Sequence, residues 1–277
     1  MTRMTAPQIT DRKALLRNRE RAERGALFLQ EQAADELQER LIEVNRSFKS
    51  VAIVTGFPDF WAERYPDAAI IPDDETLDLQ SKAHDLILHI MCLHWANDPV
   101  GQLVQARHGL KPDGLLLCTF LGGQTLHELR KSLAEAEVAV TGGLSLRIAP
   151  MGEIRDLGAL LQRAGFALPV ADSTPLIASY ANAFHVMHDL RKMGENNALT
   201  DRVKHATRRE ILIKASQIYA EHFRNTDNRV DATFEIITLT GWAPSDTQQQ
   251  PLRPGSAQAR LADALGTTET SLIRSKD

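Results

Sequence analysis

The sequence predicts an α/β fold built on a doubly wound, Rossmann-like parallel sheet. Two short apolar runs, at 86–93 and 115–120, are separated by one helix-length segment, which is the pattern of a strand–helix–strand unit. Asp98 can cap the intervening helix, and Pro99 suits its first turn. The turn Lys111-Pro-Asp-Gly114 then leads the chain back into the sheet. Repeated units of this kind give a doubly wound sheet with right-handed crossovers.

The chain opens with an expected helical extension at residues 1–49. Apolar residues recur at helical spacing over 11–48, with a break at Gly25, and the stretch from Arg12 to Arg24 is strongly basic. A solvated helix face explains such a charge run, and so does contact with an acidic partner or with substrate.

The rest of the chain alternates strands and helices. Outside the strand–helix–strand unit, the expected elements are a strand at 50–55, a helix at 59–64, a strand at 68–71, helices at 126–138 and 151–165, and strands at 166–173 and 232–241. Two helices, at 182–192 and 201–223, interrupt the alternation as a helical lid insert at 181–224, which covers a pocket or a partner surface. The α/β domain is therefore predicted at 50–243, followed by an irregular tail at 244–277 of which about the last ten residues are expected to be disordered.

Composition excludes several classes of protein. A net charge of −4 gives no overall attraction to nucleic acid, and no apolar run reaches the length of about 20 residues that spans a bilayer. The N-terminus lacks the apolar core of a secretion signal, so we expect a cytoplasmic protein. Cys92 and Cys118 fall in expected buried strands, where reduced core thiols are favoured over a disulfide.

Other catalytic patterns are weak. His185 and His188 share one helix face, and His84, His89 and His94 recur along one strand, but no cysteine or carboxylate cluster joins them at ligand spacing. We therefore predict no metal site. The G-x-S-x-G, G-x-G-x-x-G and G-x-x-x-x-G-K-[ST] motifs are all missing from the sequence, which disfavours a nucleophilic hydrolase, a dinucleotide enzyme and a P-loop enzyme.

Several segments carry a family resemblance. They are Asp11-Arg-Lys-Ala-Leu-Leu-Arg-Asn-Arg19, Leu93-His-Trp-Ala-Asn-Asp98, Leu110-Lys-Pro-Asp-Gly114, Leu121-Gly-Gly-Gln-Thr-Leu-His-Glu-Leu-Arg130, Asp156-Leu-Gly158, Arg163-Ala-Gly-Phe166, Asp189-Leu-Arg-Lys-Met-Gly-Glu-Asn196, Ala232-Thr-Phe-Glu-Ile-Ile237 and Leu239-Thr-Gly-Trp242. Together they resemble class I S-adenosylmethionine-dependent methyltransferases. The lid and Gly-Trp segments resemble the branch with the biotin-pathway malonyl-carrier methyltransferase and the mitochondrial complex I assembly factor described as an arginine hydroxylase.

The resemblance implies a cofactor loop after the first strand, and that loop is eroded here. Family members end this strand with an acidic residue in a D-x-G-x-G-x-G turn, whose glycines let the backbone approach the cofactor. The matching stretch Val51-Ala-Ile-Val-Thr-Gly56-Phe-Pro-Asp-Phe-Trp61 keeps only Gly56, and Phe57 and Pro58 crowd the turn. The interval from Gly56 to Asp85 is also too short, so about one helix–strand unit is expected to be missing.

The same resemblance implies that Gly56, Asp73, Asp74, His94 and Trp95 contact the cofactor. Asp73 or Asp74 follows the second strand and would hold the ribose hydroxyls, although both are equally explained as turn residues. His94 and Trp95 would orient substrate or pack against the sulfonium, while the alternative is core filling.

The expected substrate or lid residues are Gly122, Gly123, Gln124 and Asn196. Paired glycines at a strand end permit close approach of a ligand, and an ordinary βα turn is the alternative. No catalytic residue is assigned.

Three functions stay open. The first is S-adenosylmethionine-dependent methylation of a small-molecule or protein acceptor, in which positioning and desolvation carry the rate. The second is an arginine-hydroxylase or assembly-factor role with a protein partner at the basic N-terminal helix and the lid, although the sequence shows no two-His-one-carboxylate iron triad. The third is a pseudoenzyme that keeps the fold as a binding module, which Phe57 or Trp61 in the cofactor volume would favour.

Overall fold

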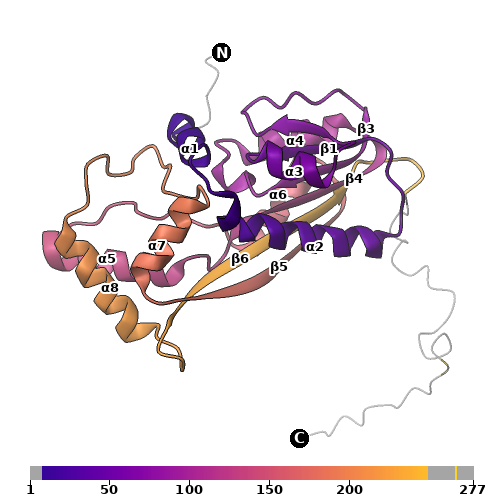
Figure 1. The fold of residues 1–277 in the computed structure, drawn as a ribbon. Helices are drawn as coiled ribbons and strands as arrows, with labels where there is room; N and C mark the ends of the chain where they lie inside the picture. The colour runs from indigo at the N-terminus through magenta and orange to yellow at the C-terminus, as the bar shows by residue number, and fades with distance from the viewer. Residues whose placement is uncertain (1–7, 249–265, 267–277) are drawn as a thin grey trace, which may run out of the picture. The chain divides into compact units, whose positions relative to one another are not determined.

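The computed structural model describes residues 8–248 and 266 and confirms the α/β fold. The chain divides into two units, Met1–Ser245 and Asp246–Asp277, and the first contains every helix and strand named below. Six strands form one sheet in the order β2-β1-β3-β4-β6-β5 (Figure 1). The strands are β1 (Val51–Thr55), β2 (Ala69–Pro72), β3 (His84–Ile90), β4 (Leu110–Gly122), β5 (Ala167–Tyr180) and β6 (Val230–Trp242).

The strand order is that of a doubly wound sheet lacking one edge unit. β2, β1, β3 and β4 are parallel, whereas β6 runs antiparallel to both β4 and β5. From β1 the chain moves out to β2 and then crosses back to β3 and β4, which is the reversal that creates a ligand-binding crevice in such sheets. No helix or strand lies between β2 and β3 within the described residues 73–83, so the predicted loss of about one helix–strand unit is confirmed.

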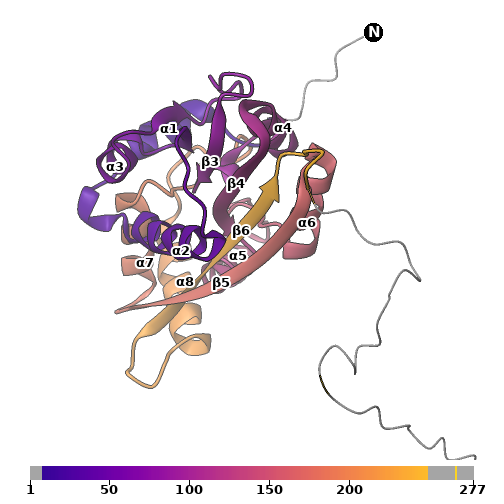
Figure 2. The same ribbon diagram turned by 90° about the vertical axis from the view of Figure 1, so that its right-hand side faces the viewer.

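Helices cover both faces of this sheet. α4 (Pro99–Gly109) and α6 (Ile154–Ala164) pack on one face, and α2 (Phe28–Val44), α3 (Pro58–Arg64) and α5 (His127–Thr141) pack on the other (Figure 2). Successive side chains of β3 alternate between the two layers, since Leu86 and Leu88 join the α2 layer while Ile87 joins the α4 layer. Burial on both faces explains why the strands read as continuous apolar runs.

The segment predicted as a lid at 181–224, which keeps that name below, contains α7 (Ala183–Lys192) and α8 (Arg209–His222). These helices gather with α5 at one end of the sheet (Figure 1). The second helix of the lid begins at Arg209 and not at residue 201 as the sequence pattern predicted. The chain is held extended before it, because Leu199 forms a bridge with Thr10 and the Thr200 amide donates to the Ile9 carbonyl over 2.8 Å. Tertiary pairing here overrides a local helical preference.

The N-terminal extension is broken earlier than expected. α1 (Arg12–Arg19) ends six residues before Gly25, and a 3₁₀ turn, η1 (Arg24–Ala26), precedes α2. Side chains of α2 such as Leu29 and Leu37 join the core beneath the sheet. The extension is thus part of the fold's packing.

Other element boundaries differ by a few residues. The strand predicted to end at Leu93 ends at Ile90, and the one predicted to end at Ser173 continues to Tyr180 because it pairs with β6 along its whole length. Cys92 therefore follows β3, while Cys118 lies in β4, and both thiols are free and buried. Nearly all of the predicted tail at 244–277 lies outside the described residues. Among the helices described, none combines the length and apolar character that crossing a membrane requires.

Candidate functional site

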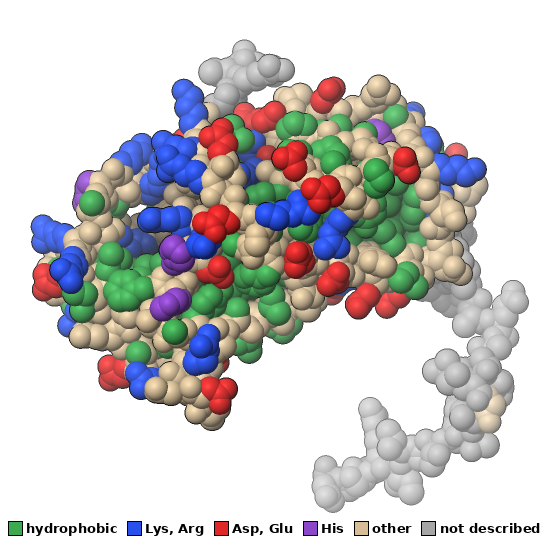
Figure 3. All heavy atoms as spheres, in the orientation of Figure 1, with side chains coloured by type: hydrophobic (Ala, Val, Ile, Leu, Met, Phe, Trp, Pro, Cys, Tyr) green, Lys and Arg blue, Asp and Glu red, His purple; other side chains and the backbone are tan. Residues whose placement is uncertain are grey.

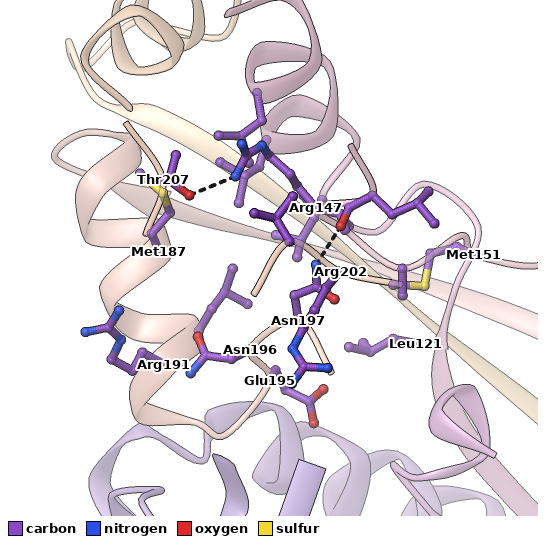
Figure 4. Close-up of a pocket in the computed structure, with 18 of the residues that line it drawn as sticks. Leu121, Arg147, Met151, Met187, Arg191, Glu195, Asn196, Asn197, Arg202 and Thr207 are labelled. Carbon is purple, nitrogen blue, oxygen red and sulfur yellow. Dashed lines mark hydrogen bonds between the residues drawn. The ribbon is translucent and has the colours of Figure 1, made fainter. Parts of the chain in front are cut away.

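A cavity of about 580 Å³, here called the acceptor cavity, lies between α5, the lid and the end of the sheet (Figure 4). Its walls are largely apolar. They include Leu121, Leu126, Leu129, Leu133, Met151, Met187, Leu190 and Leu212. Its polar lining includes His94, Trp95, Arg147, Glu195, Asn196, Asn197, Arg202 and Thr207. Volumes of about 300–1,000 Å³ with few convergent polar groups are typical of small-molecule and side-chain sites.

Glu195 carries a buried carboxylate at this cavity. Its Oε2 accepts a hydrogen bond of 2.8 Å from the Trp95 indole and lies 3.3 Å from His94 Nε2. In the described part of the chain, no hydrogen bond reaches its Oε1. Burial alone would raise the pKa of Glu195, but the hydrogen bond and charge of His94 and the charge of Arg19 lower it overall. The carboxylate is therefore ionised at neutral pH with one oxygen free to accept.

Two of the three arginines that line the cavity are paired elsewhere, whereas the third, Arg191, is exposed and forms no ion pair with a described residue (Figure 4). Arg147 Nη2 lies 2.6 Å from Glu137 Oε1, and its Nη1 donates to Thr207 Oγ1 over 2.9 Å (Figure 4). Arg202 Nη1 lies 3.0 Å from Asp11 Oδ2. The charges of Arg147 and Arg202 are thus compensated.

The predicted residues Gly56 and Asp73 follow the carboxyl ends of β1 and β2, at the place where the resemblance implies the cofactor; we call this place the cofactor cleft. Arg19 Nη1 donates to both oxygens of Asp73 at 2.9 Å, and Arg12 Nη2 lies 3.2 Å from Asp73 Oδ1. A Cβ atom on Gly56 would lie 2.2 Å from Arg19 Cζ, so the guanidinium fills the space beside the glycine. Burial tends to raise the pKa of Asp73, but the two arginines lower it overall.

The cofactor cleft as it stands does not fit S-adenosylmethionine. Of the two carboxylates expected to hold the ribose hydroxyls, Asp73 is bonded to Arg19 and Asp74 is paired with Arg12. The one remaining glycine of the loop faces the Arg19 guanidinium. The helix after the loop has seven residues, with Pro58 in its first turn, so it offers few backbone donors.

The aromatic residues of the eroded loop lie beside the cleft or behind it. The Phe57 ring centroid is 5.8 Å from Arg19 Cζ. Trp61 is fully buried and donates its indole hydrogen to Gln30 Oε1 over 3.0 Å, toward α2. Arg19, rather than Trp61, is the side chain that occupies the space at Gly56.

Four of the remaining residues predicted from the sequence lie at the acceptor cavity or beside the cofactor cleft. His94, Trp95 and Asn196 line the acceptor cavity. Asp74 is 65 % exposed and pairs with Arg12 at 3.3 Å.

Gly122, Gly123 and Gln124 form a turn held by Glu235 and are absent from the cavity lining. The Gln124 amide donates to Glu235 Oε2 over 2.7 Å, and Gly123 has a φ of +52°, which favours glycine. The ligand roles of all nine residues predicted from the sequence stay predictions.

Sequence reasoning missed the residues that organise both places, namely Glu195 and Arg19. Glu195 stands beside Asn196 in a polar loop between two helices and within the resemblance segment that ends at Asn196, but neither setting distinguishes its carboxylate from its neighbours. Arg19 was hidden within a basic run that reads as a solvated face. Over the described residues, no group of three or more His, Cys, Asp or Glu side chains lies close enough to hold a metal ion.

Comparisons with curated proteins identify relatives. The chain is 39% identical over 198 residues to "Arginine-hydroxylase NDUFAF5, mitochondrial" of Danio rerio, covering 72% of this chain and 61% of the relative. It is 38% identical to the protein of that name from Homo sapiens, covering 72% and 57%. It is 33% identical to the malonyl-[acyl-carrier protein] O-methyltransferase of Xylella fastidiosa, covering 65% and 59%. The matches thus span about three fifths of these relatives, and no family model matches the chain.

Solved structures of similar shape include a putative methyltransferase from Bacillus halodurans. Its TM-score is 0.47 at 14% identity, with coverage of 75% of this chain and 98% of that one.

The comparisons contradict the cytoplasmic location predicted from the sequence. All five arginine-hydroxylase relatives are named as mitochondrial proteins. The error has a physical reason, because a folded domain with a polar surface suits the aqueous interior of an organelle as well as the cytosol.

The resemblance seen in the sequence segments is confirmed by these relatives and by the order of strands in the sheet. The chain therefore has the strand order of a class I methyltransferase fold, and its sequence is similar to the arginine hydroxylase NDUFAF5 and to malonyl-[acyl-carrier protein] O-methyltransferase over about three fifths of their lengths.

Proposed function

We propose that this protein recognises an arginine side chain of a partner protein in the acceptor cavity. The observation that carries the proposal is the free Oε1 of the buried Glu195 carboxylate at the edge of an apolar cavity. The names of the arginine-hydroxylase relatives support the choice of arginine over other cations.

The two halves of an arginine side chain match the two kinds of lining. The leucine and methionine walls suit its aliphatic stem, which loses little by burial. The guanidinium would donate to Glu195 Oε1, a charge-assisted bond that is stronger than a neutral one. Trp95 and His94 fix the carboxylate in place from the other side, so the guest does not have to order it.

A basic surface beside the cavity supports a protein partner rather than a free amino acid. Lys13, Arg17 and Arg21 are exposed on or just after α1, and Lys and Arg side chains gather over this helix in Figure 3. An acidic stretch next to the guest arginine would contact them. This surface would mainly raise the association rate and would weaken with salt.

Methyl transfer from S-adenosylmethionine is the second candidate. The O-methyltransferase relative favours it, and so do Gly56 and Asp73, which directly follow the paired strand ends Thr55 and Pro72. It ranks second because the Arg19 side chain would first have to leave the cofactor cleft.

The arginine proposal is tested by titrating the full chain with N-acetyl-arginine amide and with the neutral isostere N-acetyl-citrulline amide. We expect the arginine derivative to bind at least tenfold more tightly, and the Glu195→Gln variant to lose that preference. Glu221→Gln, an exposed acid on α8, is the matched control and should behave as wild type. Equal binding of the two derivatives, or unchanged binding by Glu195→Gln, would contradict the proposal.

A further inference from the structure

α1 and the residues around it lie between the cofactor cleft and the lid and are bonded to both. On the cleft side, Arg19 holds Asp73 at 2.9 Å. On the lid side, the backbone pairs with the segment 192–200, which we call the lid loop. Its contacts are Glu23 N to Lys192 O at 2.7 Å, Asp11 N to Ala198 O at 2.8 Å, Thr200 N to Ile9 O at 2.8 Å and Asn18 Nδ2 to Asn196 O at 3.2 Å.

The Arg19 side chain is built into the cleft. Its side chain is 5 % exposed and Asp73 is 4 % exposed, so each buried charge depends on the other. Gly56 is the residue that admits the guanidinium, since a Cβ there would collide with Cζ, Nη1 and Nε. The glycine that the family uses for close approach of a cofactor thus serves close approach of an arginine here.

Two donors of this arginine remain unsatisfied. Arg19 Nε and Nη2 are buried and have no partner among the described residues. A buried unpaired donor weakens the state that contains it. The docked position of α1 is held by the pairings of Arg19 and Arg12 with Asp73, by the backbone contacts to the lid loop, and by the packing of Ala14 and Leu15 in one cluster with Trp95, Ala198 and Leu199.

We propose that Arg19 is an internal ligand of the cofactor cleft, which orders the lid loop in place of S-adenosylmethionine. Because α1 is bonded to both places, loss of the Arg19–Asp73 pairing would loosen the contacts of α1 with the lid loop, which carries Glu195. The lid is ordered without a nucleoside cofactor, and the cleft does not accept one while α1 is docked. This inference concerns the cleft and stands independently of which guest enters the acceptor cavity.

Amide hydrogen exchange on the full chain tests this coupling. In Arg19→Met, which keeps an apolar stem but removes the charge, we expect the lid-loop amides, including that of Thr200, to exchange at least tenfold faster than in wild type. The matched control is Arg24→Met, which breaks the exposed Arg24–Glu63 pair of 2.6 Å in the neighbouring turn. The control should leave the lid loop unchanged. Wild-type exchange should also be insensitive to 1 mM S-adenosylhomocysteine.

A second variant guards against misfolding of the first. Gly56→Ala retains both charges but places a Cβ where the guanidinium lies, so it should loosen the lid loop in the same way. If the lid-loop amides of both Gly56→Ala and Arg19→Met exchange at the wild-type rate, the proposal is overturned. Micromolar binding of S-adenosylhomocysteine to the wild-type protein would overturn it too. The arginine titration is scored separately, so failure of one proposal does not carry over to the other.

Discussion

At the scale of single residues, the ionised groups around the acceptor cavity are stabilised by specific partners rather than by water. Glu137 is the clearest case, because Arg147 forks onto its carboxylate while the Ser145 amide donates to Oε2 at 3.1 Å. The hydrogen bond from Arg147 is the main cause, and it lowers the pKa of Glu137 from 4.5 to about 2, against an opposing effect of burial. The ion pair with Glu137 holds the Arg147 side chain in its position in the lining of the cavity.

Glu137 predicts a pH dependence of stability. Its folded pKa lies below its unfolded value, so its stabilisation is present above about pH 4.5 and is lost as the pH falls toward 2. We expect Glu137→Gln to lower the free energy of unfolding at pH 7 by about 1–3 kcal/mol and to flatten its dependence between pH 5 and 3. Urea unfolding at several pH values measures both. A variant as acid-sensitive as wild type would show that Glu137 is not responsible.

We expect a smaller loss of stability when the hydrogen bond from Trp95 to Glu195 is removed. Trp95→Phe should lower stability by about 1–2 kcal/mol, because the indole donor is lost while most of the ring remains. Trp242→Phe is the comparison, since that ring packs on the Arg46 guanidinium at 5.6 Å. Equal losses in the two variants would mean that ring size, and not the bond to Glu195, sets the effect.

At the scale of elements, local rules predicted the strands and caps well, but failed where distant segments pair. The Asp98 cap of α4 was predicted and is present, since its Oδ1 accepts from the Gly101 amide over 2.8 Å. The start of α8 was misplaced because the bridge between Leu199 and Thr10 joins segments far apart in sequence. For the same reason, nothing local showed that Arg19 would leave the solvated face of α1 and enter the cleft.

The α4 cap supplies a test at this scale. Asp98→Ala should lower the free energy of unfolding by about 1 kcal/mol, the usual worth of a side-chain cap. Glu153 precedes α6 and makes no capping hydrogen bond, so Glu153→Ala should change stability by less than about 0.5 kcal/mol. Thermal or urea unfolding compares them directly. If the two losses are the same, the cap bond contributes nothing measurable.

At the scale of the whole molecule, the methyltransferase fold is retained, whereas one of the two expected sites, the cofactor cleft, is occupied by Arg19. The sheet keeps the strand order of a methyltransferase, and the lid still closes over a cavity. The family resemblance therefore predicted the architecture, whereas the cofactor contacts that it implied for His94 and Trp95 stay predictions. It did not predict the packing of Arg19 against Gly56, because one eroded loop allows a side chain from elsewhere in the chain to use the space. Fold and function can diverge in this way on many scaffolds.

The measurement that tests the account most directly is calorimetric titration of the full-length wild-type chain with N-acetyl-arginine amide, without and with S-adenosylhomocysteine. We predict saturable binding in the absence of the nucleoside, with an affinity that 1 mM S-adenosylhomocysteine leaves unchanged. Binding that requires S-adenosylhomocysteine would contradict the account by showing that the cofactor cleft is still used. No binding under either condition would contradict the assignment of the cavity to an arginine side chain.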